Sequence, residues 1–146
     1  MADEPLPSPR NLDGMHVTIG PVASAVHIED AWTPAAGAEI SFVNVMEHCR
    51  PAAFGFAFGG VSYTDRDGGR LWFEIEAALK DPLPVAVGIG VGAAAEVDPV
   101  KDARFGGQAT LWVFAGVIPY VRAGTLDGEG TFLEAGVMLK VPALRF

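Results

Sequence analysis

A chain of 146 residues has the length of one domain and can bury a sizeable core. The 18 acidic and 10 basic residues give a net charge of −8, and no basic run is present, so a nucleic-acid phosphate backbone is excluded as the expected partner. The chain also contains 18 glycines and 11 prolines, which weaken helix interiors, so an all-α fold is disfavoured.

The number of cysteines and the hydropathy further narrow the classes of protein to which this chain could belong. Cys49 is the single cysteine, so no disulfide can form within the chain. The mean hydropathy is +0.30, yet no apolar run reaches the roughly 18–20 residues of a membrane-spanning helix. The first ten residues are acidic and proline-rich and lack the apolar segment of a signal peptide. This start fits either a cytoplasmic protein or a mature form with its leader removed and Met1 added.

In chain order, a short arm precedes one β domain. Residues 1–14 are predicted to be a flexible, proline-rich arm, and residues 15–146 a single barrel domain. Turn signals such as Thr33-Pro34 and Asp67-Gly68 separate the domain into about eight segments. The expected strands are 15–28, 38–46, 52–63, 70–79, 85–97, 104–114, 116–123 and 131–142, with an irregularity at Gly20-Pro21.

The segment 85–97 has the clearest strand pattern. Branched apolar residues such as Ile89 and Val91 alternate with Gly88, Gly90 and Gly92, which is the period of two that a strand requires. Most other segments repeat this alternation. Residues 70–80 also carry apolar residues at helical spacing, with Glu76 and Lys80 at i,i+4, so a helix there is the alternative.

The two faces of these strands indicate the environment of the protein. A stripe of glycine and alanine would leave backbone exposed in water, whereas it suits the crowded interior of a narrow barrel. We therefore predict that the other face points outward. The predicted outward apolar face comprises Phe54, Phe56, Phe58, Leu71, Phe73, Ile75, Val85, Val87, Ile89, Val91, Leu111, Val113, Leu133, Val137 and Leu139.

Charged residues fall on the small-residue face. Glu39 is one of them, and with it the lumen would hold four acidic and four basic side chains. Buried charges must be paired, so we predict an ion-pair network inside the barrel. Its predicted members are Arg70, Glu74, Glu76, Arg104, Arg122, Glu134 and Lys140.

Over residues 15–146 the chain resembles the small eight-stranded outer-membrane barrels, such as the transmembrane domain of outer-membrane protein A. The dyad alternation, the strand lengths and number, and the terminal Phe146 with Leu144 two positions before it carry the resemblance. It implies an all-β, antiparallel up-and-down barrel in which Phe146 acts as an assembly signal. It also implies aromatic girdles, for which Trp32, Tyr63 and Tyr120 are the candidates near strand ends.

Motifs that carry chemistry are weak in this sequence. Gly88-Ile-Gly90-Val-Gly92-Ala93 matches a dinucleotide-binding loop but lacks room for the helix that must follow. His48-Cys49 lies in a turn without metal-ligand spacing. Glu74 and Glu76 share a face and could act as acid and base, but an ion-pair role is favoured. Trp72 and Trp112 would face the lumen, either to bind a ring-shaped ligand or to fill the barrel.

We therefore expect no catalytic, cofactor or metal site and no cofactor. The leading hypothesis is a non-enzymatic barrel of the outer membrane or cell surface, with a narrow ion-paired lumen and a structural or small-pore role. Its partners would be membrane lipid or copies of itself. Two alternatives remain open: a self-assembling subunit of a tube, ring or filament, and a soluble, lipocalin-like barrel that binds an apolar ligand.

Overall fold

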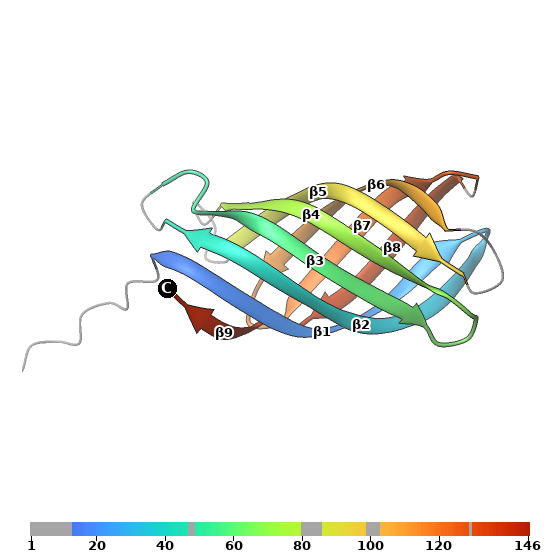
Figure 1. Ribbon diagram of the computed structural model, residues 1–146, viewed down its shortest axis with the longest axis horizontal. Coiled ribbons are helices and arrows are strands. Elements are labelled where there is room, and N and C mark those ends of the chain that lie inside the picture. Colours follow the sequence, from blue (N-terminus) through green and yellow to red (C-terminus); the bar gives the residue numbers. More distant parts are fainter. Residues whose placement is uncertain (1–12, 47–48, 80–85, 99–102, 129) are drawn as a thin grey trace, which may run out of the picture.

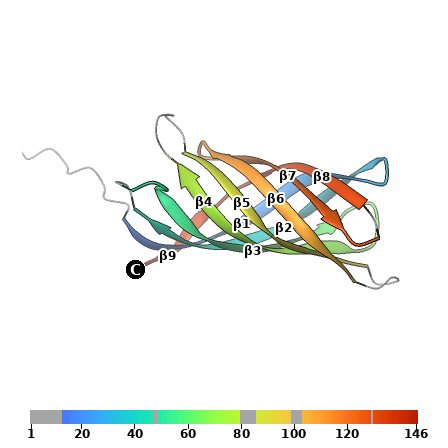
Figure 2. The ribbon, with the colours of Figure 1, turned by 90° about the horizontal axis from the view of Figure 1, so that it is seen from above.

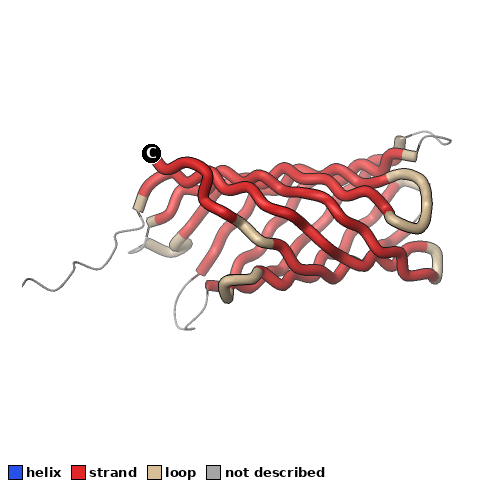
Figure 3. The backbone as a smooth tube through the Cα atoms, turned by 90° about the horizontal axis from the view of Figure 1, so that it is seen from below, coloured by secondary structure: helices blue, strands red, loops and turns tan. Residues whose placement is uncertain are grey.

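The computed structural model describes residues 13–46, 49–79, 86–98, 103–128 and 130–146. All regular structure in these residues is β, as the backbone trace shows (Figure 3). None of them forms a helix with the length and apolar character needed to cross a membrane. The described strands are β1 (Gly14–Ile28), β2 (Ala31–Val45), β3 (Ala53–Tyr63), β4 (Gly69–Leu79), β5 (Ala86–Val97), β6 (Arg104–Phe114), β7 (Ile118–Leu126), β8 (Gly130–Met138) and β9 (Val141–Arg145).

The strands close into a barrel. Each of β1 to β7 pairs antiparallel with the next strand, and β1 pairs with β8 and β9 along its other edge. Strands β8 and β9 follow one another along β1 and together fill the eighth position (Figures 1 and 2). The predicted fold class, an antiparallel up-and-down barrel of about eight strands, is confirmed. The predicted arm lies outside the described residues up to residue 12, and Gly14 begins β1.

The register defines the shape of the barrel. Successive register partners around the barrel are Gly14, Val45, Ala53, Ala78, Gly88, Trp112, Tyr120, Gly136 and Ser24. The path leaves β1 at residue 14 and returns to it at residue 24, so the stagger is 24 − 14 = 10 residues. Eight strands with this stagger are tilted by about 40° from the barrel axis. The interior of such a barrel is wide enough only for side chains.

The barrel has one irregularity, close to the position that the sequence indicated. Pro21 lacks an N–H, and its carbonyl accepts a hydrogen bond from the Leu139 N–H at 3.1 Å, in the gap between β8 and β9. The register between β1 and β9 shifts at Val17 and Thr18, three residues before Gly20-Pro21. The last barrel strand is therefore interrupted where β1 carries this dipeptide.

The predicted strand at 70–79 is confirmed as β4, so the helical alternative for 70–80 is wrong. Two other strand predictions need correction. The predicted strand 131–142 is divided into β8, which ends at Met138, and β9, which begins at Val141. Strand β2 begins at Ala31 rather than at residue 38, and Thr33-Pro34 lies within it instead of marking a turn. The hydrogen-bonded ladder between β2 and β3 starts only at Ala35. Pro34 lies before this ladder, so its lack of an N–H removes no hydrogen bond between β2 and β3.

Apolar side chains cover the outside of the barrel. Val91, in the middle of β5, is 54% exposed, and the other large members of the predicted apolar face are similarly exposed. Val87 and Val113 are partly exposed, and Val85 lies outside the described residues. The exposed members are Phe54, Phe56, Phe58, Leu71, Phe73, Ile75, Ile89, Val91, Leu111, Leu133, Val137 and Leu139.

The inside of the barrel is packed with the opposite face of each strand. Val26, Phe132 and Met138 are buried there together with the charged side chains described below. Tyr63 and Tyr120 are buried as well, so the expectation that they belong to outer girdles is wrong. Their positions in β3 and β7 place them on the lumen face, whereas Trp32 is exposed at the start of β2.

A matched pair of glycines tests this inside–outside assignment. A Cβ at Gly59 would lie 2.5 Å from the buried ring of Trp72, whereas a Cβ at Gly107 would find its nearest atom, the Gly92 carbonyl oxygen, at 3.7 Å. We expect Gly59→Val to lower the free energy of unfolding by about 1–3 kcal/mol through overpacking. Gly107→Val should be neutral or slightly stabilising, because valine suits an outward strand position. Urea unfolding in detergent micelles measures both, and equal effects would contradict the assignment.

Candidate functional site

The middle of the lumen is organised around Arg122 of β7. Its Nε donates to the Thr110 hydroxyl at 2.8 Å, and its guanidinium lies 3.5 Å from Glu74, 3.6 Å from Glu39 and 3.4 Å from Glu134. These three carboxylates come from three different strands, β4, β2 and β8. All four charged side chains are essentially inaccessible to solvent. One cation therefore links carboxylates from separate parts of the barrel wall.

Glu134 joins this centre to a second arginine. Its carboxylate accepts hydrogen bonds from Arg70 of β4 and from the Tyr120 hydroxyl at 2.6 Å, in addition to the Arg122 contact. A buried carboxylate that receives three donors is well compensated, since charge-assisted hydrogen bonds replace its lost hydration. Arg70 and Glu134 are both completely buried.

Lys140 supplies the cation on the side of the chain termini. Its ammonium lies 2.8 Å from Glu39, 3.6 Å from Glu76, and 2.8 Å from the Ser41 hydroxyl oxygen. Glu39 also accepts a hydrogen bond from the Trp72 indole N–H at 2.8 Å. Lys140 lies in the break between β8 and β9, so the irregularity of the last strand places this cation in the lumen.

Two neutral side chains donate hydrogen bonds to one oxygen of Glu74. Gln108 donates to its Oε1 atom at 2.7 Å, and the Thr110 hydroxyl donates to the same oxygen. Aromatic rings flank the two arginines. The Arg122 guanidinium lies 4.1 Å from the ring centre of Trp72, and Arg70 lies 4.2 Å from that of Phe132. The network is thus enclosed by packed rings.

A second, smaller group lies at the end of the barrel away from the termini. Arg66, in the turn between β3 and β4, pairs with Glu96 of β5 at 2.9 Å and covers the Tyr63 ring at 4.8 Å. Arg104 is the register partner of Glu96 on β6. Arg104, a predicted member of the network, therefore lies at this end and beside a different carboxylate from those that contact Arg122.

The charges of the two groups compensate each other. The larger group has four carboxylates and three cations, which leaves one negative charge, and the smaller group has two arginines and one carboxylate, which leaves one positive charge. The ten side chains therefore sum to zero. Glu96 and Arg66 were not singled out from the sequence. Glu96 shares its strand face with Gly90 and Gly92, a signal that could have revealed it, whereas Arg66 is in a turn and has no such pattern.

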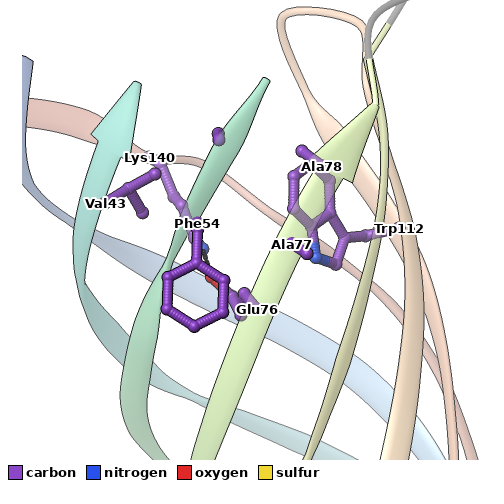
Figure 4. Close-up of a pocket in the computed structure, with 8 residues that line it drawn as sticks. Val43, Phe54, Glu76, Ala77, Ala78, Trp112 and Lys140 are labelled. Atoms are coloured by element: carbon purple, nitrogen blue, oxygen red, sulfur yellow. Dashed lines mark ion pairs between the residues drawn. The ribbon is translucent and has the colours of Figure 1, made fainter. Parts of the chain in front are cut away.

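A small cavity adjoins the larger group (Figure 4). Its volume is about 50 Å³, and Val43, Glu76, Ala78, Trp112 and Lys140 are among its lining residues. This space accommodates only a few water molecules. It is far below the roughly 300–1,000 Å³ of pockets that hold organic ligands.

The arrangement offers little for catalysis. Glu74 and Glu76 contact different cations, Arg122 and Lys140, and do not face a shared reaction space. Gly88, Gly90 and Gly92 lie within β5 rather than in a loop before a helix. Cys49 is exposed, and His48 lies outside the described residues. In the part of the chain that the structure describes, no three His, Cys, Asp or Glu side chains are grouped so that they could hold a metal ion.

Removing one carboxylate tests whether the lumen depends on these pairs. We expect Glu134→Gln to lower the free energy of unfolding by about 3–5 kcal/mol, because Arg70 and Arg122 then lose a buried counter-charge. Glu29→Gln, at an exposed turn position, should have no measurable effect. The double variant Glu134→Gln/Arg70→Gln should recover part of the loss, which a double-mutant cycle in urea measures. Strict additivity of the two changes would speak against the network.

Comparisons with known proteins agree with the architecture. No protein-family model and no curated protein matches the sequence. Among solved structures, the de novo designed protein TMB2.3 is 16% identical with a TM-score of 0.53, covering 90% of this chain and 98% of that one. Neisserial surface protein A is 12% identical with a TM-score of 0.51, covering 89% of this chain and 97% of that one. At these identities the likeness concerns the fold. The chain therefore has the fold of the small eight-stranded outer-membrane β-barrels.

Proposed function

We propose that this protein is a non-enzymatic barrel that spans an outer membrane, with a closed, ion-paired lumen and a structural role. The observation that carries the proposal is the distribution of polarity. Large apolar side chains such as Phe56, Ile75 and Val91 are about half exposed on the outside, while Arg122 and Glu134 are fully buried inside. A barrel dissolved in water has the opposite arrangement, whereas lipid provides an apolar surrounding for this one.

Strand length supports the same role. A tilted strand crosses the hydrocarbon core of a bilayer in about 9–11 residues. Strands β1 to β8 have between 9 and 15 residues, so each is long enough to cross with the tilt that the register defines. The strands are also joined in a closed cycle, so β1 to β8 present no strand edge to lipid along their shared ladders.

The two alternative functions fit the molecule less well. A lipocalin-like barrel needs an apolar cavity, but this lumen contains packed ion pairs beside a cavity of about 50 Å³. A subunit of a homopolymer would need an apolar patch on the sides that meet its neighbours. Here the exposed apolar side chains occur on every strand of the barrel, from Ile19 on β1 to Leu133 on β8. Lipid surrounds a barrel on all sides, so it matches this distribution better.

The membrane role is tested by one charge placed at two depths. Val91→Arg puts a guanidinium at the middle of β5 and should cost about 2–4 kcal/mol of insertion free energy. Ser62→Arg adds the same charge to the outside of the barrel near the end of β3, where the cost should be about 0–1 kcal/mol. Refolding into lipid vesicles, followed by flotation of the vesicles, measures insertion. Equal insertion of the two variants, or a wild-type protein that stays monodisperse in buffer without lipid, would contradict the proposal.

A closed lumen has a consequence for transport. Because Arg70, Arg122, Trp72 and Glu134 fill the middle of the barrel, we expect no steady ion current through the wild-type protein in a planar lipid bilayer. Detergent without protein is the control for transient leaks. Reproducible single-channel steps of uniform size would show that the lumen conducts and would overturn the structural role in favour of a pore.

A further inference from the structure

The end of the barrel opposite the C-terminus is acidic. The turns from β1 to β2, from β3 to β4 and from β7 to β8 lie at this end (Figure 1). Arg66 is the one basic residue in the described part of these turns. The acidic end comprises six carboxylates from these turns and from the residue after β5, and all but Asp98 are exposed: Glu29, Asp30, Asp65, Asp67, Asp98 and Asp127. Such a surface attracts cationic molecules.

Glu96 of β5 faces the acidic end from inside the lumen. Glu96 is only 3% exposed, and its Oε1 atom accepts a hydrogen bond at 2.9 Å from Arg66, which reaches it from the turn between β3 and β4. The other oxygen, Oε2, is buried and receives no hydrogen bond from any described residue. A buried oxygen without a donor costs free energy, so this carboxylate can accept a further N–H.

Tyr63 adds an aromatic face to this carboxylate. The Arg66 guanidinium lies 4.8 Å from the centre of the Tyr63 ring while it pairs with Glu96. Carboxylates and aromatic faces are the two kinds of group that bind a guanidinium, the first through its N–H donors and the second by stacking. An arginine can also donate to both oxygens of a carboxylate, whereas Arg66 donates to one. Glu96 and Tyr63 thus form a guanidinium site that Arg66 fills incompletely.

Arg66 can leave this site at low cost. Its side chain is 31% exposed, and a partly exposed ion pair contributes little to stability because water screens it. Asp65 and Asp67 flank Arg66 in the sequence, so a displaced guanidinium stays close to carboxylates. A guanidinium from another molecule would bring the same charge to Glu96. The charge balance of the lumen is therefore kept when one guanidinium replaces the other.

We propose that the acidic end binds a basic segment of another protein, and that one arginine of this segment displaces Arg66 from Glu96 and Tyr63. The exposed carboxylates attract the segment to this end. The guanidinium site then selects arginine over lysine, because an ammonium group lacks the planar fork that matches both carboxylate oxygens. The turns of the acidic end lie beyond the strands and are accessible in lipid as in water, so the proposal does not rest on the membrane role.

The test uses the full chain refolded in nonionic detergent micelles and two fluorescent peptides, hexa-arginine and hexa-lysine. Fluorescence anisotropy at low salt measures the Kd of each peptide, and micelles without protein are the control. We expect the wild-type protein to bind hexa-arginine about threefold more tightly than hexa-lysine. Arg66→Gln empties the guanidinium site, so the preference for hexa-arginine should increase to about tenfold or more.

Two further variants separate the site from a general attraction between charges. Arg50→Gln removes a positive charge from an exposed turn at the other end, and the preference should stay within about twofold of the wild-type value. Arg66→Gln/Glu96→Gln has the net charge of the wild-type protein but lacks the buried carboxylate, so the preference should be lost. Near-ultraviolet circular dichroism verifies that each variant is folded.

A measurement on the wild-type protein alone follows Arg66 directly. Its Nε–H signal in the NMR spectrum should shift when hexa-arginine saturates the protein, because the guanidinium leaves Glu96. Two results would overturn the proposal. In the first, the two peptides bind equally to the wild-type and Arg66→Gln proteins, which would show that the exposed carboxylates attract any cation. In the second, the Arg66 signal is unchanged at saturation, which would show that Arg66 stays at Glu96.

Discussion

The charges buried in the lumen govern both the register and the closure of this barrel. Arg122 and Glu134 have no access to solvent, and each would be very costly to bury alone. Arg122 lies within 3.6 Å of carboxylates from β2, β4 and β8, so its compensation requires the barrel to be closed in the correct register. A strand shifted by one residue would turn its charge outward and leave its partners unpaired. The ion pairs thus select one register, and closure in that register brings the ion pairs together.

The small residues of the lumen face make room for this network. Gly59 faces the ring of Trp72, and Gly88 faces that of Trp112. Each ring occupies the space that the side chain of any other residue would fill at the glycine position. Trp72 in turn contacts Arg122 and donates to Glu39. The glycine-rich pattern of β5 is therefore a packing requirement of a narrow barrel, rather than a loop that binds a nucleotide.

Much of the fold could be predicted from the sequence because a strand has a period of two. The alternation of Val91 with Gly90 and Gly92 identifies the two faces of β5, and charges on the small-residue face identify candidates for the lumen. The start of β2 could not be predicted, because Thr33-Pro34 has the local chemistry of a turn. The proline is tolerated in this strand because Pro34 lies before the β2–β3 ladder, which starts at Ala35, so no ladder hydrogen bond to β3 is lost.

The pairing of the lumen side chains could not be predicted from the sequence, for a different reason. Which charge meets which depends on the stagger of the strands, a property of the closed barrel that no single segment encodes. Arg104 shares its strand face with Gln108, yet the stagger places it at the far end of the barrel beside Glu96. Arg66 lies in a turn, where alternation gives no prediction about the direction of a side chain.

The membrane location of the apolar face can be measured most directly with single spin labels on the outside of β5, because their collision rates show whether lipid or water surrounds them. In a Cys49→Ser background, labels at Ile89→Cys, Val91→Cys and Ala93→Cys of protein in lipid vesicles report collisions with oxygen, which concentrates in lipid, and with a water-soluble nickel complex. A label on native Cys49, which lies in the exposed turn between β2 and β3, is the reference. We expect high oxygen and low nickel accessibility at the three β5 positions, and the reverse at Cys49. High nickel accessibility at Val91 would place the apolar face in water and contradict the membrane location.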